Sequence, residues 1–183
     1  SIIFITIAYS GINTFIPVYA KSLQMAHMAN YFFVLFALII VLSRPWTGKL
    51  FDRMGDHITI YPCMFFYAAG LIVLSQAHTP FLFLASGAMI ALGHGTLYSC
   101  LQVIAIKSSP DQRRGSAIST YLLFSDAGVG IGSLLLAWVA ESMDYSAMYL
   151  VSSAAICLAL MSYFGLYHRN RKMRKIPEVT IHE

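Results

Sequence analysis

Six runs of about twenty apolar residues, separated by short polar segments, dominate the sequence. They cover approximately residues 1–20, 28–47, 58–76, 81–106, 115–139 and 146–167. An α-helix of this length spans the ~30 Å hydrocarbon core of a bilayer. Charged residues make up only 11% of the chain, whereas soluble domains carry about 25%. The sequence therefore predicts an integral membrane protein.

The predicted fold class is an all-α membrane protein built as a bundle of six transmembrane helices. In lipid, every backbone N–H and C=O group must find a partner within the protein, which an α-helix provides by itself. Continuous apolar runs of this length also differ from the alternating ~10-residue strands of a membrane barrel. We expect residues 1–168 to form the helical domain and residues 169–183 to form a basic tail.

Lysine and arginine are distributed unevenly between the two sides of the predicted bundle. On one side, Lys21 is the one basic residue, and the acidic Glu141 and Asp144 lie on the same side. Because basic loops are retained in the cytoplasm, the pattern predicts a multi-pass cell-membrane protein with a cytoplasmic C-terminus. We therefore interpret the net positive charge as a determinant of membrane orientation and not as a surface that binds nucleic acid. The basic residues of the other side are Arg44, Lys49, Arg53, Lys107, Arg113, Arg114, Arg169, Arg171, Lys172, Arg174 and Lys175.

Three of the six runs carry polar side chains at helical spacing, as expected for helices that face an aqueous path. In the fifth run the polar residues lead into a glycine-rich face that suits close helix packing. The third and sixth runs are almost wholly apolar, and we expect them to face lipid. The polar residues are Thr6, Tyr9, Ser10, Asn13 and Thr14 in the first run, His94, Tyr98 and Gln102 in the fourth, and Ser119, Ser125 and Asp126 in the fifth.

Asp126 is the one acidic residue far from any predicted loop. Eleven residues after Gly115, at 1.5 Å each, it lies ~16 Å deep and near the bilayer midplane. It must therefore bind a proton, face water or pair with a group outside the chain. It is a candidate for proton coupling or substrate contact, although a protonated Asp126 that ties helices together would also fit. The full set of candidate substrate and proton pathway residues is Asp126, His94, Tyr98, Gln102, Tyr9 and Asn13.

The sequence indicates no metal site, cofactor site or catalytic site. Its three cysteines lie far apart in separate apolar runs and form no CxxC pair. An intramembrane enzyme is not favoured, because Ser99 and His94 point to different faces of one helix and no G-x-S-x-G motif is present. We therefore expect a protein that is not an enzyme and that uses no cofactor.

The polar segment after the second run, residues 44–55, is expected to form a short loop. Asp52 can accept hydrogen bonds from free N–H groups at a helix N-terminus, and Gly55 permits a tight turn. Through Gly48, Leu50, Asp52, Arg53 and Gly55 the segment resembles G-x-L-x-D-R-x-G, the cytoplasmic signature of the major facilitator superfamily, in its second occurrence between helices 8 and 9. Asp56 and His57 stand where that signature usually continues with basic residues.

Residues 10–17, 110–115 and 126–132 are similar to helix 7, the loop between helices 10 and 11, and helix 11 of exporter-like members of that superfamily. The likeness covers nearly the whole chain as helices 7 to 12, one half of a twelve-helix fold. It implies that helices 7, 10 and 11 line a central site, that helices 9 and 12 are peripheral, and that Asp52 acts on a gate formed with an N-terminal six-helix half.

The function expected from this resemblance is secondary transport by alternating access, as proton-coupled efflux of a small amphipathic molecule. Its partners would be that substrate, protons, the lipid bilayer and the N-terminal half, with no nucleic acid. The chain starts at Ser1 and enters an apolar stretch at once, so we expect it to be a fragment. The alternatives are uptake instead of export, and a non-transporting membrane protein that keeps the fold for interaction or sensing.

Overall fold

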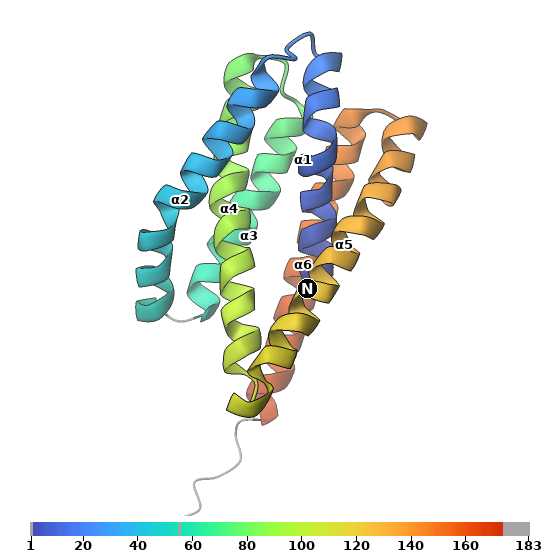
Figure 1. Cartoon of the computed structure of the whole chain (residues 1–183). Coiled ribbons are helices and arrows are strands. Elements are labelled where there is room, and N and C mark those ends of the chain that lie inside the picture. The colour runs from blue at the N-terminus through green and yellow to red at the C-terminus, as the bar shows by residue number, and fades with distance from the viewer. Residues whose placement is uncertain (1, 55, 174–183) are drawn as a thin grey trace, which may run out of the picture.

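The computed structural model describes the backbone of residues 2–54 and 56–173 and the side chains of residues 2–46 and 59–165. Across this part of the chain it contains helices and no strand (Figure 1). The predicted all-α membrane bundle of six helices is confirmed. The elements are α1 (Ile2–Ser22), α2 (Met28–Met54), α3 (Asp56–Ser75), α4 (Pro80–Lys107), the short 3-10 helix η1 (Asp111–Arg113), α5 (Arg114–Ser142) and α6 (Tyr145–Met173).

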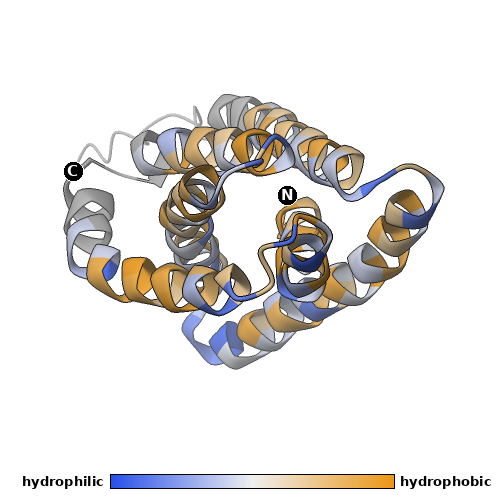
Figure 2. Cartoon of the chain, turned by 90° about the horizontal axis from the view of Figure 1, so that it is seen from above, coloured by the Kyte–Doolittle hydropathy of each residue, from blue (hydrophilic) through white to orange (hydrophobic). Residues whose placement is uncertain are grey.

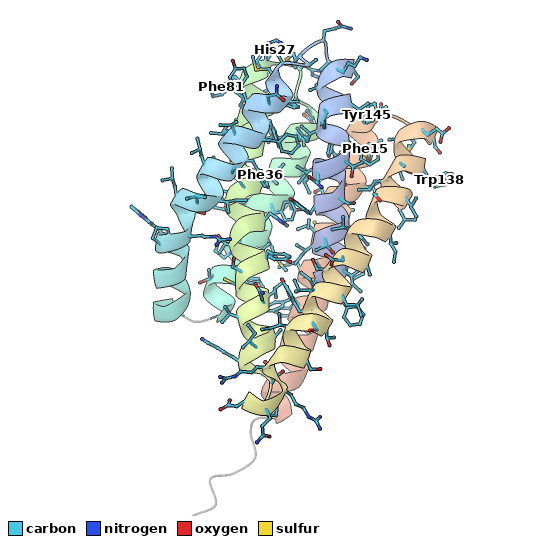
Figure 3. All side chains as sticks on the ribbon, viewed as in Figure 1. Phe15, His27, Phe36, Phe81, Trp138 and Tyr145 are labelled. Atoms are coloured by element: carbon cyan, nitrogen blue, oxygen red, sulfur yellow. The ribbon has the colours of Figure 1, made fainter. Side chains whose placement is uncertain are left out.

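The outer surface of the bundle is apolar. Five helices, α1, α2, α4, α5 and α6, are long and apolar enough to cross a membrane, whereas the described apolar part of α3 is the shorter segment Thr59–Ser75. Figure 2 shows apolar residues along most of the length of the helices. Trp46 of α2 is 81% exposed, and Trp138, which points away from the bundle near the upper end of α5 (Figure 3), is 69% exposed. Exposed tryptophans near opposite ends suit the two membrane interfaces.

The chain alternates direction from helix to helix. The connections α2–α3 and α4–α5 lie at one end of the bundle, and the other three connections lie at the opposite end (Figure 1). At this opposite end, side-chain caps mark the first residues of α4 and α6. Thr79 caps α4 by accepting a hydrogen bond from the Leu82 N–H, and Asp144 caps α6 by accepting one from the Ala147 N–H at 2.7 Å. We call the end that carries the α4–α5 connection, with Lys107 and Arg113, the basic end.

The helices pack as two related groups of three. α1 packs mainly on α5 and α6, α4 packs mainly on α2 and α3, and α3 contacts α6. If α1, α2 and α3 are exchanged with α4, α5 and α6, the same pattern of contacts results. As a set, the helices α4–α6 begin at the end of the bundle opposite to that at which the set α1–α3 begins (Figure 1). The bundle is therefore an inverted pair of three-helix repeats. Because α1 and α4 are equivalent in the two repeats, the polar residues of these two helices meet near the middle of the bundle.

Small residues allow α5 to approach α1 closely. A Cβ atom added at Gly132 would lie 2.7 Å from the Cα atom of Ile7, and one added at Gly128 would overlap the Thr6 hydroxyl. The Thr6 and Ser10 hydroxyls donate to backbone carbonyls of their own helix, at 3.1 Å and 2.7 Å. The glycine-rich face expected on the fifth run therefore packs against the hydroxyl face of α1.

One expected boundary is wrong. Residues 44–55 were expected to form a loop, but α2 continues to Met54. α6 continues to Met173, so the first residues of the segment expected as a basic tail are helical. The fall in hydropathy marks the end of the apolar span and not the end of the helix, because Lys, Leu, Arg and Met are all good helix formers. Of the signature residues, Gly48, Asp52 and Arg53 have only their backbone described, in the last turns of α2, and Gly55 lies outside the described residues.

Candidate functional site

A cavity of about 310 Å³ lies between α1, α4 and α5. These are the three helices that carry polar stripes in the sequence. His94 is at the centre of α4, and Asp126 lies twelve residues after Arg114, about 18 Å along α5. The cavity is therefore at mid-depth in the bundle. Its lining consists of Thr6, Tyr9, His94, Tyr98, Ser125, Asp126 and Val129.

The structure brings together four of the six candidate pathway residues, namely Tyr9, His94, Tyr98 and Asp126. Asn13 is exposed, one turn beyond Tyr9 on α1, and Gln102 is half-buried, one turn beyond Tyr98 on α4. Neither of them lines the cavity. The polar stripe expected on α1 is thus divided, because Thr6 and Tyr9 line the cavity, Ser10 packs against α5, and Asn13 is exposed.

Aromatic rings surround His94, which is 6% exposed. The Tyr9 ring stacks on the imidazole with 4.2 Å between centroids and an interplanar angle of 2°. Tyr67 of α3 meets it edge-on at 5.5 Å, Tyr98 lies at 6.0 Å, and Phe36 of α2 lies at 6.4 Å. Phe36 is labelled in Figure 3 between α2 and α4. His94 therefore joins side chains of four helices.

The His94 Nδ1 atom is buried and has no hydrogen-bond partner within the described part of the chain. Leaving such a group unpaired costs about 1–3 kcal/mol, so nearly all buried polar groups in proteins are satisfied by the protein, by water or by a ligand. The Ser99 hydroxyl, on the same helix, donates to the Gly95 carbonyl at 3.1 Å.

Hydrogen bonds hold the Tyr98 side of the cavity between α4 and α5. The Tyr121 hydroxyl donates to the backbone carbonyl of Tyr98 at 2.7 Å, and the Ser125 hydroxyl donates to the Tyr98 hydroxyl at 3.5 Å. The Tyr98 and Tyr121 rings also meet edge-on, 5.5 Å apart. These contacts fix the position of the Tyr98 ring on the cavity wall.

The Asp126 carboxylate is exposed in the cavity and forms no ion pair with any described residue. Within the described side chains, the one salt bridge joins Arg114 and Asp111 at 2.8 Å, at the basic end and far along α5 from the cavity. An uncompensated charge at mid-depth in a membrane requires water, a proton or a cation. The carboxylate therefore stays the candidate for a contact with a proton or a cation in this cavity.

Aromatic rings close the bundle on the side of the cavity away from the basic end. Tyr19 of α1 lies 5.1 Å from Tyr149 and 6.3 Å from Phe83, and its hydroxyl donates to the Leu74 carbonyl at 3.0 Å. Phe15 and Tyr145 lie close together near the same end (Figure 3), with 6.5 Å between centroids. This packing links α1 to α3, α4 and α6, so the bundle has a continuous core on the side of the cavity away from the basic end.

Sequence reasoning missed Tyr67 and Phe36 as neighbours of the candidate site. Tyr67 is fully buried, and its hydroxyl donates to the Ile5 carbonyl at 3.4 Å. A tyrosine in an otherwise apolar run was the available signal, because a buried hydroxyl needs a partner on another element. Phe36 gave no such signal, since a phenylalanine facing a site has the same pattern as one facing lipid.

The sequence matches a known protein family. The model of the Major Facilitator Superfamily matches residues 1–180. An uncharacterized MFS-type transporter of Pseudomonas aeruginosa is 27% identical over 166 residues, which are 91% of this chain and 41% of that protein. Uncharacterized MFS-type transporters of Methanocaldococcus jannaschii and Burkholderia mallei are each 26% identical, over 86% and 90% of this chain. The chain spans about two fifths of the length of these relatives.

Proposed function

Since the chain belongs to the major facilitator superfamily, we propose that it forms the C-terminal half of a secondary transporter. The cavity between α1, α4 and α5 would be the share of the substrate path that this half contributes. The observation that carries the proposal is the meeting of Asp126, His94, Tyr9 and Tyr98 at mid-depth, on the helices that are central in an inverted-repeat bundle. Substrate sites of such transporters lie at the midplane, between repeats.

Asp126 supports coupling of this transport to protons. Its carboxylate can be neutralised by a proton in one conformation and exposed to water in another, which links proton movement to the change of conformation. The titratable groups that face it in the cavity are His94, Tyr9 and Tyr98. In the proposed mechanism the two halves rock about the site, and Gly48, Asp52, Arg53 and Gly55 serve the gate on the basic end. Export and uptake use the same motion, and we propose export of a small amphipathic molecule.

The test is gradient-driven flux by the complete transporter, with both six-helix halves, in proteoliposomes. An imposed pH gradient should drive transport of a compound from a panel of amphipathic molecules, and a protonophore should abolish its accumulation. Flux that does not respond to the protonophore would contradict proton coupling. The complete absence of flux across the panel, with protein that is folded and inserted, would instead support the non-transporting interaction or sensor function.

The orientation of the bundle gives a separate prediction. In a variant lacking Cys63, Cys100 and Cys157, His78→Cys should react with a membrane-impermeant maleimide on intact cells, whereas Gln112→Cys should react only after permeabilisation. Both positions are exposed in connections at opposite ends, and the basic end is expected to stay in the cytoplasm. The reverse labelling pattern would show that the basic end faces outward.

A further inference from the structure

The cavity combines one carboxylate with aromatic walls. Among the described residues, Asp126 and His94 are the acidic and basic side chains of the lining, and no described lysine or arginine is part of it. A charged group in a partly dehydrated site selects ligands of opposite charge and rejects those of like charge. The charge of the lining therefore favours a cation over an anion.

Two tyrosine rings can add to this preference. Tyr9 and Tyr98 both line the cavity and are partly exposed. The imidazole of His94 covers one face of the Tyr9 ring, at 4.2 Å, and the rest of that ring is available to the cavity. A cation within ~6 Å of an aromatic centroid is attracted to the face of the ring, most strongly where water is excluded. The rings also suit an apolar body attached to the cation.

Two hydroxyl groups of the lining already donate hydrogen bonds within the protein. The Thr6 hydroxyl donates to the Ile3 carbonyl, and the Ser125 hydroxyl donates to Tyr98. Each hydroxyl has a single donor hydrogen, so these two are already used within the protein. Neither of these two hydroxyls has a hydrogen left to donate to a ligand. The Nδ1 atom of His94 has no hydrogen-bond partner among the described residues.

We propose that this cavity binds small organic cations, with an amine or quaternary ammonium group held by the Asp126 carboxylate and the rings of Tyr9 and Tyr98. The inference rests on the proposed transport function, for which it names the substrate class. The cavity volume of about 310 Å³ is at the lower limit of ordinary ligand sites, about 300–1,000 Å³. This volume is the part of the proposed site that the present half contributes.

The experiment is equilibrium binding of radiolabelled benzyltrimethylammonium to the purified complete transporter in nanodiscs. Unlabelled competitors are benzyltrimethylammonium itself, neopentylbenzene, which has the same shape without the charge, and phenylmethanesulfonate, which carries the opposite charge. The cation should compete at concentrations at least about tenfold lower than either analogue. Asp126→Asn should weaken cation binding at least about tenfold, and Asp126→Glu should retain most of it.

A second pair of variants separates the ring from the hydroxyl of Tyr98. Tyr98→Phe keeps the aromatic face and should bind the cation within about threefold of wild type, whereas Tyr98→Leu should bind about five- to tenfold more weakly. Both should elute as monodisperse protein in size-exclusion chromatography. Equal loss in the two variants would contradict a role of the ring face and would point to the hydroxyl.

The outcomes separate this inference from the proposed function. If the neutral or anionic analogue competes as well as the cation, or if no cation binds while the protein shows gradient-driven flux of another compound, the substrate class is wrong and transport stands. If benzyltrimethylammonium binds in an Asp126-dependent manner but neither it nor any other compound is transported, the cation site stands and the transport function is wrong.

Discussion

Gly93→Ala is expected to destabilise the bundle, whereas Gly130→Ala is expected to leave it unchanged or slightly more stable. A Cβ atom at Gly93 would lie 2.5 Å from the Cys63 carbonyl oxygen and 2.7 Å from both the Cβ and the backbone nitrogen of Tyr67. Two of these three atoms belong to the α3 backbone, so a change of rotamer cannot relieve the contact. Overpacking of this kind costs about 1–3 kcal/mol, occasionally more.

Gly130 provides the matched control, because a Cβ atom added there has no atom within 4 Å. Both glycines lie inside helices, so alanine favours the helix by up to about 1 kcal/mol at either position. The difference between the variants thus measures packing alone. Thermal unfolding followed with a thiol-reactive dye suits the measurement, since Cys100 is buried and Cys63 half-buried next to Gly93, and the exposed Cys157 can be replaced in every variant. Equal melting curves would show that α3 and α4 are not packed as described.

The same substitution should also affect the candidate site. Gly93 precedes His94, and the clash would push α4 away from Tyr67, whose ring lies edge-on to the imidazole at 5.5 Å. Packing between α3 and α4 therefore sets the position of a side chain that lines the cavity. This dependence explains how α3, which contributes no residue to the cavity lining, contributes to its geometry.

The helical periodicity of polar residues predicted most of the candidate site. Tyr9, His94 and Tyr98 were selected because they repeat on single faces of their runs, and Asp126 also because it is an acid far from any predicted loop; the structure places all four on one cavity. Asn13 and Gln102 were selected by the same rule and lie one turn outside it. Periodicity fixes the direction in which a side chain points around the helix, but it contains no information about the depth at which neighbouring helices separate.

Properties that depend on neighbouring helices could not be read from the sequence. The tilt of α5 against α1 depends on Gly128 and Gly132, whose close contacts with Thr6 and Ile7 involve residues more than a hundred positions away.

The end of α2 is a different case, because the polar signature segment was expected to be a loop and is helical to Met54. Hydropathy reports the solvent around a residue, and a helix can continue from lipid into water without a change in its backbone.

Asp126→Asn is expected to reduce gradient-driven transport by the complete protein roughly 30-fold or more, since losing one partner of a charge interaction in a dehydrated site costs about 2–5 kcal/mol. Asparagine has the shape of a protonated carboxyl group and can still donate a hydrogen bond between helices. A purely structural Asp126 would therefore tolerate the change, and the variant would transport normally.

The matched control for this substitution is Asp144→Asn. Asp144 lies outside the cavity and caps α6 through a hydrogen bond from the Ala147 N–H at 2.7 Å, a role that asparagine also fills. Both variants should show wild-type expression and size-exclusion profiles, and only Asp126→Asn should lose accumulation of substrate in proteoliposomes. Because the chemical change is the same at the two positions, a selective loss would assign the effect to a charge at mid-depth. Equal activity of the two variants would show that Asp126 joins helices and that the coupling group lies elsewhere in the transporter.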